Sequence, residues 1–147
     1  MIRVDSCLIP PGMIASAKMY SLVLEGDTLY QLFTGPGPAS IIDYSRGLLH
    51  LRQSKDMLTN AVTTAVVNHY IGPIQANEAR INPQSLATMA QEKHSCVYDR
   101  SSIGDIVYKE QGAWIKFSFS AKGKKIKFDC SIIYKEELQA LAQALAS

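Results

Sequence analysis

The sequence predicts an α+β fold in which a curved antiparallel sheet is closed by a C-terminal helix. Apolar and polar residues alternate with a period of two over much of the last third of the chain, which is typical of strands that bury one face. The period then becomes that of an amphipathic helix. An early β-hairpin is separated from the late strands by a stretch of about fifty residues with helical periodicity.

Length and composition favour one globular domain that spans residues 1–147. The chain is 47% hydrophobic and 19% charged, which is ordinary for a folded domain with a single core. A net charge of +2 is too small to indicate a nucleic-acid partner. No apolar run approaches the ~18 residues of a transmembrane helix.

Pro10-Pro11-Gly12 is interpreted as a turn or an extended entry segment, and no strand is assigned before Lys18. The N-terminal apolar run Cys7–Ile14 is interrupted by Pro10-Pro11-Gly12, which argues against a secretory signal peptide. Three cysteines without paired spacing indicate reduced thiols rather than a disulfide framework or a zinc ribbon: Cys7, Cys96 and Cys130. We therefore expect a cytoplasmic protein.

The first predicted strands form a β-hairpin. Tyr20–Leu24 and Thr28–Phe33 are rich in aliphatic and aromatic residues, and Glu25-Gly26-Asp27 supplies a glycine for the reversal. Prolines and glycines in segment 34–38 end the second strand. The glycines of this segment do not have the spacing of a phosphate loop or a dinucleotide fingerprint.

Residues 40–93 are predicted to be a helical insertion between the second and third predicted strands. Helical spacing extends over Ser40–Ile71 and predicts either two helices or one helix with a break near Arg46-Gly47, and Gly72-Pro73 is expected to stop this helical region. A short helical patch is expected at Ile74–Arg80. Asn82-Pro83 then predicts the start of a further helix that ends near Lys93.

Four strands and a closing helix are predicted after the insertion. The strands are Ser95–Asp99, Ile103–Glu110, Ala113–Ser120 and Lys124–Ser131, and the helix is Tyr134–Ala146. The side chains expected to face the core are Ile115, Phe117, Phe119, Ile126, Phe128 and Cys130 on the strands, and Leu138, Leu141, Ala142 and Leu145 on the helix.

Five segments together resemble a known superfold: the hairpin 20–33, Ser102–Ile106, Trp114–Phe119, Lys125–Phe128 and the helix Lys135–Leu145. They are similar to the pleckstrin-homology (PH) superfold, in the form of its uncharacterised bacterial members. The resemblance implies a seven-stranded antiparallel barrel or curved sheet with a C-terminal capping helix. Only six strands are predicted here, and the insertion 40–93 has no place in a minimal member of the superfold.

A group of lysines is the first candidate ligand-binding surface. The group consists of Lys116, Lys122, Lys124, Lys125 and Lys127. The resemblance implies that basic loops at a barrel mouth hold inositol phosphates, and lysine binds phosphate as a point charge. However, the familiar site of the superfold lies at the first hairpin, which is acidic here because of Glu25 and Asp27. The alternative is a solvated hairpin tip whose charges protect a sheet edge from aggregation.

A helix with few charges is the second candidate surface. Its small and apolar residues are Leu58, Val62, Ala65, Val66 and Tyr70. Such a helix is either buried beneath the rest of this chain or exposed to a partner, including a copy of itself in a homodimer.

Reactive groups form no recognised catalytic signature in the sequence. His94 and Cys96 lie two residues apart, but a zinc site needs about four ligands. Asp99, Asp105 and Asp129 are spread over separate strands. We expect no metal, no cofactor and no catalysis.

The sequence therefore predicts a non-catalytic interaction domain that docks an unknown protein partner. The alternatives are binding of an anionic lipid or phosphorylated ligand, with peripheral membrane contact through the lysines, and a small enzyme with a pocket between the sheet and the insertion.

Overall fold

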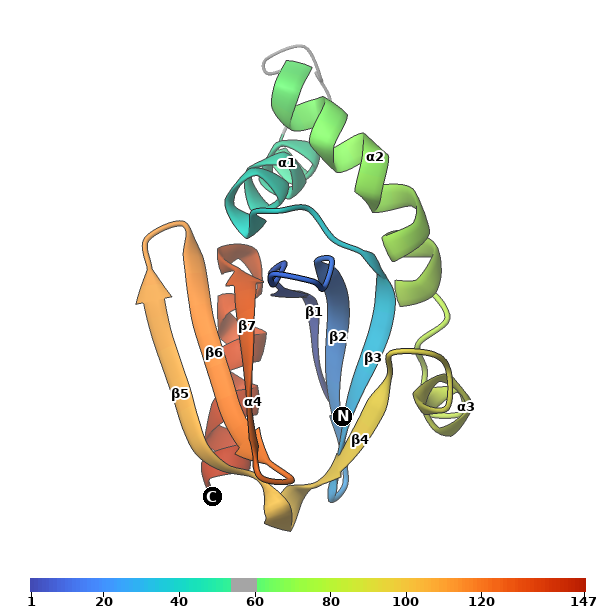
Figure 1. Cartoon of the computed structure of the whole chain (residues 1–147), viewed down its shortest axis with the longest axis vertical. Coiled ribbons are helices and arrows are strands. Elements are labelled where there is room, and N and C mark those ends of the chain that lie inside the picture. Colours follow the sequence, from blue (N-terminus) through green and yellow to red (C-terminus); the bar gives the residue numbers. More distant parts are fainter. Residues whose placement is uncertain (54–60) are drawn as a thin grey trace.

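The structure is a computed structural model that describes residues 1–53 and 61–147, with side chains described for 1–49 and 68–147. Its strands form one antiparallel seven-stranded sheet in the order β4-β3-β2-β1-β7-β6-β5 (Figure 1). The strands are β1 (Ile2–Ile9), β2 (Lys18–Glu25), β3 (Thr28–Pro36), β4 (Cys96–Asp99), β5 (Gly104–Gln111), β6 (Trp114–Ala121) and β7 (Lys124–Ser131). The α-helices are α1 (Ile41–Gln53), α2 (Ala61–Glu78), α3 (Leu86–Ala90) and α4 (Lys135–Ala146). The predicted α+β class is confirmed.

The alternating pattern of the late strands does bury one face, as predicted. Ile115, Phe117 and Phe119 are fully buried in β6, and Phe128 and Cys130 are fully buried in β7. These residues belong to the main core cluster, together with apolar residues of β1, β2 and α4. The early hairpin is also present as β2 and β3, with Gly26 at a positive φ of 59° in the turn between them. The expectation that segment 34–38 ends the second strand was wrong for its first part, because β3 continues to Pro36, and Gly35 and Pro36 pair with Met19 and Lys18 of β2 across a register shift.

The N-terminal segment contains a strand, β1, that was not predicted, whereas Pro10-Pro11-Gly12 lies in the connection between β1 and β2, as expected. β1 pairs with β2 along most of its length and with β7 through Cys7 and Leu8. It therefore joins the two halves of the sheet. Its pattern was hidden because Ser6 has a φ of +57° at a register shift between Val4 and Cys7, which interrupts the alternation of a regular strand.

The helical insertion covers the predicted part of the sequence, but it follows the third strand and not the second. Because β1 precedes the hairpin, helices α1, α2 and α3 lie between β3 and β4. Figure 1 shows α1 and α2 at one end of the sheet and α3 beside β3 and β4. Helix α1 packs against α2 and β7, and α2 packs against β3.

The expected helix stop at Gly72-Pro73 was wrong. Helix α2 continues through Pro73 to Glu78. A proline within a helix removes a hydrogen bond and costs ~3 kcal/mol. Here the next residue, Ile74, is fully buried in a cluster with Tyr44 and Ile41 of α1. Tertiary packing thus outweighs the local preference for ending the helix.

The helix predicted after Asn82-Pro83 is much shorter than expected. Helix α3 covers only Leu86–Ala90. The Asn82 carboxamide oxygen accepts hydrogen bonds from the backbone N–H groups of Gln84 and Ser85, both 3.0 Å long, and so stabilises a turn before the helix.

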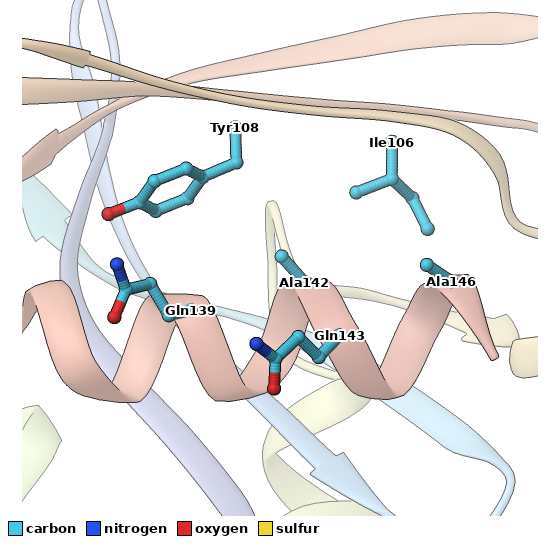
Figure 2. A pocket seen from close by; sticks show the side chains of 6 residues that line it. All are labelled: Ile106, Tyr108, Gln139, Ala142, Gln143 and Ala146. Carbon is cyan, nitrogen blue, oxygen red and sulfur yellow. The ribbon is translucent and has the colours of Figure 1, made fainter.

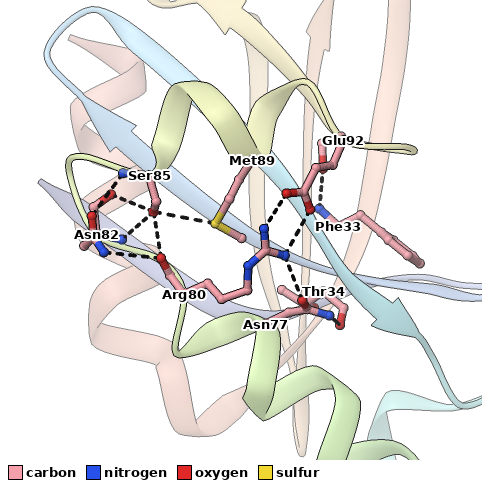
Figure 3. Close-up of polar contacts among 9 residues, drawn as sticks. Phe33, Thr34, Asn77, Arg80, Asn82, Ser85, Met89 and Glu92 are labelled. Atoms are coloured by element: carbon pink, nitrogen blue, oxygen red, sulfur yellow. Dashed lines mark hydrogen bonds and ion pairs between the residues drawn. The ribbon is translucent and has the colours of Figure 1, made fainter.

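Polar contacts tie the end of the insertion to β3 (Figure 3). The Asn77 amide donates to the Thr34 carbonyl at 2.9 Å, and the Arg80 guanidinium binds both carboxylate oxygens of Glu92. The Ser95 hydroxyl accepts a 2.8 Å hydrogen bond from the Phe33 backbone N–H. These contacts hold α2, α3 and the start of β4 in one arrangement.

Helix α4 closes the sheet as predicted. Leu138, Leu141 and Leu145 are buried, and the helix packs against β1 and β5. In the described ladders, β4 pairs only with β3 and β5 pairs only with β6. Strands β4 and β5 are therefore the two edges of a curved sheet, and backbone hydrogen bonds do not close it into a complete barrel.

Within residues 1–53 and 61–147, no helix has both the length and the apolar character needed to cross a membrane.

Candidate functional site

A groove between α4 and the edge strand β5 is the candidate site. It has a volume of about 470 Å³. Figure 2 shows Ile106 and Tyr108 of β5 pointing toward the helix. The residues that line the groove are Ile106, Tyr108, Gln139, Ala142, Gln143 and Ala146.

The groove exists because α4 uses large side chains on one stripe and small ones on the next. Its leucines fill the core, whereas Ala142 and Ala146 face β5 with only a methyl group each. Ile106 and Tyr108 are two residues apart in a strand, so both point to the same side. The result is an apolar floor with two glutamine side chains at its border.

The outer edge of β5 is available for pairing. β5 pairs with β6 on one side, and none of the described strands pairs with its other side. An unpaired strand edge presents N–H and C=O groups that can pair with another extended chain. The groove therefore lies beside a strand edge with which no described strand pairs.

The other edge of the sheet is covered. The Lys122 ammonium donates a 3.0 Å hydrogen bond to the Val97 carbonyl of β4 and lies 5.1 Å from the ring centroid of Tyr98. β4 is also only four residues long. A short strand and a covering side chain protect the β4 edge, whereas β5 is eight residues long and has a register shift between Gly104 and Val107, with Asp105 at a φ of +51°.

Charged groups mark one end of the groove. The Tyr108 hydroxyl donates to Glu110 at 2.9 Å, and Lys135 forms a 3.1 Å ion pair with the same carboxylate. The hydrogen bond from Lys135, followed by that from Tyr108, lowers the pKa of Glu110. Partial burial raises the pKa of Tyr108, so its hydroxyl stays a hydrogen-bond donor at neutral pH.

The five predicted lysines lie along the hairpin of β6 and β7, but no single described pocket is lined by all of them. All are exposed, but Lys122 is engaged at the β4 edge. Lys116 lies opposite Asp129 on the outer face of β6 and β7. Burial raises the pKa of Asp129, and the charge of Lys116 opposes this shift. A shallow groove of about 370 Å³ is lined by Lys124, Lys125 and Lys127 together with Ile9, Pro10 and Ile126.

Most of the predicted helical surface cannot be placed at the level of side chains. Leu58 lies outside the described residues, and Val62, Ala65 and Val66 lie in the part of α2 whose side chains are not described. Tyr70 is half-buried and packs against a core cluster of this chain.

The reactive groups named from the sequence are not brought together. His94 packs edge-on against Phe33, with ring centroids 5.1 Å apart. The Cys96 thiol donates to the Tyr98 hydroxyl at 3.1 Å and lines an open pocket of about 340 Å³, to which His94 does not contribute. Among the residues that the structure describes, no three His, Cys, Asp or Glu side chains form a metal-binding group.

A carboxyl pair not predicted from the sequence lies between β1 and α2. The Asp5 carboxylate accepts hydrogen bonds from Ser21 at 2.6 Å and from Arg3 at 2.9 Å, and it shares a hydrogen bond with Glu78. Burial, followed by the charge of Asp5, raises the pKa of Glu78 to about 7. No sequence pattern marked this pair, because Asp5 lies in an unassigned segment and Glu78 lies beyond the expected helix stop.

Comparisons with protein-family models, with curated proteins and with solved structures gave no match.

Proposed function

We propose that this protein is a non-catalytic interaction domain that binds an extended peptide segment of a partner protein. The segment adds to β5 as a further strand and places side chains in the groove beside α4. The observation that carries this proposal is the free edge of β5 next to an apolar groove, in a sheet whose other edge is covered by Lys122. Main-chain pairing supplies affinity in such binding, and pockets for alternate side chains supply specificity.

The groove defines the chemistry of the peptide. Ile106 and Tyr108 are two residues apart on β5. In an added strand, every second side chain would likewise point toward α4. Ala142 and Ala146 leave room for aliphatic side chains at these alternate positions. Gln139 and Gln143 can both donate and accept hydrogen bonds at the border.

The PH-like relationship remains part of this proposal. The seven strands, their continuous curved order and the closing helix α4 support it. A homodimer is an alternative outcome, in which β5 of one copy pairs with β5 of the next.

A selection experiment tests the proposal. A random peptide library is panned on the full protein, with counter-selection on an Ala142→Trp variant whose indole fills the groove. We expect peptides with alternate aliphatic residues that bind the wild-type protein at least about tenfold more tightly than the variant. Binding should protect the amides of 104–111 from hydrogen exchange.

An Ala140→Trp variant is the matched control, because Ala140 is exposed on α4 and does not line the groove. It should bind the selected peptides as the wild-type protein does. The proposal is wrong if selected peptides are indifferent to Ala142→Trp or protect a different strand. A protein that sediments as a dimer through β5 would identify the partner as a second copy.

One observation favours a second function, binding to an anionic membrane surface. Met13 and Ile14 are fully exposed at the tip of a turn, in which the Gly12 N–H donates to the Ala15 carbonyl at 2.9 Å. The same β1–β2 connection contributes Pro10 to the shallow groove that Lys124, Lys125 and Lys127 line. An apolar tip beside basic side chains is suited to the interface of a negatively charged bilayer.

Vesicle sedimentation tests this second function. Binding to phosphatidylserine-containing vesicles should fall when Met13 and Ile14 are changed to serine, and binding through the lysines should weaken as salt rises. Equal binding to purely phosphatidylcholine vesicles, or no loss with the serine variants, would exclude it.

A further inference from the structure

Two cysteines that are far apart in the sequence lie directly opposite each other in the sheet. Cys7 of β1 and Cys130 of β7 are register partners in an antiparallel pair. Both are fully buried in the main core cluster. No sequence pattern paired them, because the strand that carries Cys7 was not predicted.

The pair lies at the narrowest connection of the sheet. β1 and β7 are joined through two residue pairs, Cys7 with Cys130 and Leu8 with Asp129. By contrast, β6 and β7 are paired over eight positions. The β1–β7 connection is also the only described ladder between strands β1–β4 and strands β5–β7.

The geometry at this position suits a disulfide bond. Directly opposed residues of antiparallel strands have Cα atoms about 4.5–5.5 Å apart, which is within the range that a disulfide spans. The two residues are register partners with both side chains in the main core, and the Cys7 thiol has a hydrogen bond with Cys130 besides its contacts to the Val4 carbonyl at 3.7 Å and the Asp5 carbonyl at 3.8 Å. Burial, followed by the hydrogen bond with Cys130, raises the pKa of Cys7 well above its usual range.

The third cysteine does not compete for this pairing. Cys96 lies on β4, at the edge of the sheet, and its thiol is engaged with Tyr98. Of the three free thiols, Cys7 and Cys130 are therefore the two that the fold places together.

We propose that Cys7 and Cys130 form a reversible disulfide that joins β1 to β7 when the protein meets a low-molecular-weight disulfide such as oxidised glutathione. The thiolate of one cysteine attacks the glutathione disulfide, forms a mixed disulfide and releases one glutathione thiolate. The second cysteine, as its thiolate, attacks the protein sulfur of the mixed disulfide and releases the second glutathione. One disulfide is consumed and one is formed, two glutathione thiols are produced, and the protons of the two cysteines pass to solvent or to the glutathione thiolates.

Oxidation requires a local opening of the β1–β7 connection, since neither sulfur reaches solvent in the closed sheet. The bond then closes a loop that contains nearly the whole chain, which restricts the unfolded state strongly. It also fixes the half of the sheet that carries β5 to the half that carries β1, the two strands on which α4 packs. The proposal does not depend on the peptide-binding function.

The test uses the full chain with a Cys96→Ser substitution, which leaves the two core cysteines as the only thiols. The folded protein is incubated with oxidised glutathione, without denaturant and at urea concentrations below the unfolding transition. We expect the intact mass to fall by two hydrogen atoms, and a non-reducing digest to yield a peptide that links Cys7 to Cys130. The unfolding equilibrium constant should fall at least about tenfold, and a reducing agent should restore it.

A Cys7→Ser, Cys96→Ser variant is the control, and it should show no such mass loss. Two results would overturn the proposal. One is a Cys96→Ser protein that keeps both thiols, or collects only glutathione adducts, at every urea concentration below unfolding. The other is an intramolecular disulfide that increases the unfolding equilibrium constant.

Discussion

Lys122 donates a hydrogen bond to the Val97 carbonyl, so the turn between β6 and β7 covers the free edge of β4. The two residues are 25 positions apart in the sequence, and the contact joins strands that are not neighbours in the order of the sheet. It leaves β5 as the open edge, and the asymmetry of the two edges is the basis of the proposed function.

Removal of the Lys122 ammonium should expose β4. We expect Lys122→Ala to lower the free energy of unfolding by less than about 1 kcal/mol, because the side chain is exposed. Its main effect should be concentration-dependent self-association through the freed edge. Sedimentation velocity measures this effect. Lys125→Ala removes the same charge from the outer face of the hairpin and should keep the oligomeric state of the wild-type protein. Equal self-association of both variants would identify the lost charge, and not the exposed β4 edge, as the cause.

Truncation of a core leucine of α4 should destabilise the whole domain. Leu141 is fully buried between the helix and the sheet. Leu141→Ala should therefore lower the free energy of unfolding by about 2–5 kcal/mol, through lost burial and the cavity that remains. Urea denaturation measures the change. Gln143→Ala on the exposed side of the same helix should cost less than ~0.5 kcal/mol, and a similar cost for both variants would contradict the observed orientation of α4.

Stability should depend on pH through Glu78. Its pKa is about 7 in the folded protein, compared with about 4.3 in an unfolded chain. A raised carboxyl pKa means that folding favours the protonated form, so this contribution is complete below about pH 4 and is lost as the pH rises through about 7. Because Glu78 is only partly buried, we expect the loss to be about 1–2 kcal/mol after allowance for solvent screening.

Glu78→Gln replaces the titratable carboxyl group by an amide of similar shape that does not titrate. The variant should be more stable than the wild-type protein at pH 8 and should show a flatter dependence of stability on pH between 4 and 8. Urea midpoints over this range measure it. A wild-type protein whose stability rises from pH 5 to pH 8, with the same slope in the variant, would show that Glu78 is not the responsible group.

Lys135 should control the ionisation of Glu110 at the end of the groove. Its hydrogen bond is the largest cause of the lowered pKa of Glu110. Lys135→Met should raise this pKa toward that of a free glutamate, as measured by carbon-detected NMR titration. Lys109→Met, which changes the charge of a neighbouring strand residue without breaking the ion pair, should have a smaller effect; the reverse order would contradict the contact.

Several elements could be predicted because their signals are local. The alternation in β6 and β7 and the leucine stripe of α4 depend on residues within one element, and both patterns survive in the fold. The hairpin of β2 and β3 was likewise marked by its turn. The lysines were correctly expected at one hairpin. That Lys122 contacts the β4 edge while Lys116 lies on the outer face opposite Asp129 depends on strand pairing and could not be predicted.

Other elements were hidden because a tertiary contact outweighs a local rule. The bulge at Ser6 breaks the period of β1, and the strand is stabilised by neighbours on both sides. Pro73 stays within α2 because Ile74 packs beneath the helix. The groove beside β5 could not be anticipated, since it needs the position of α4 relative to a strand edge.

The sequence by itself determined the mixed α+β class, the late strands and the amphipathic closing helix, because period and turn chemistry act over a few neighbouring residues. Only the tertiary structure decided which strand joins the two halves of the sheet, which edge remains open, and which cysteines and carboxyls meet. These features depend on pairs such as Cys7 with Cys130 and Asp5 with Glu78, whose distance along the chain leaves no local pattern. Burial of one shared core brings them together.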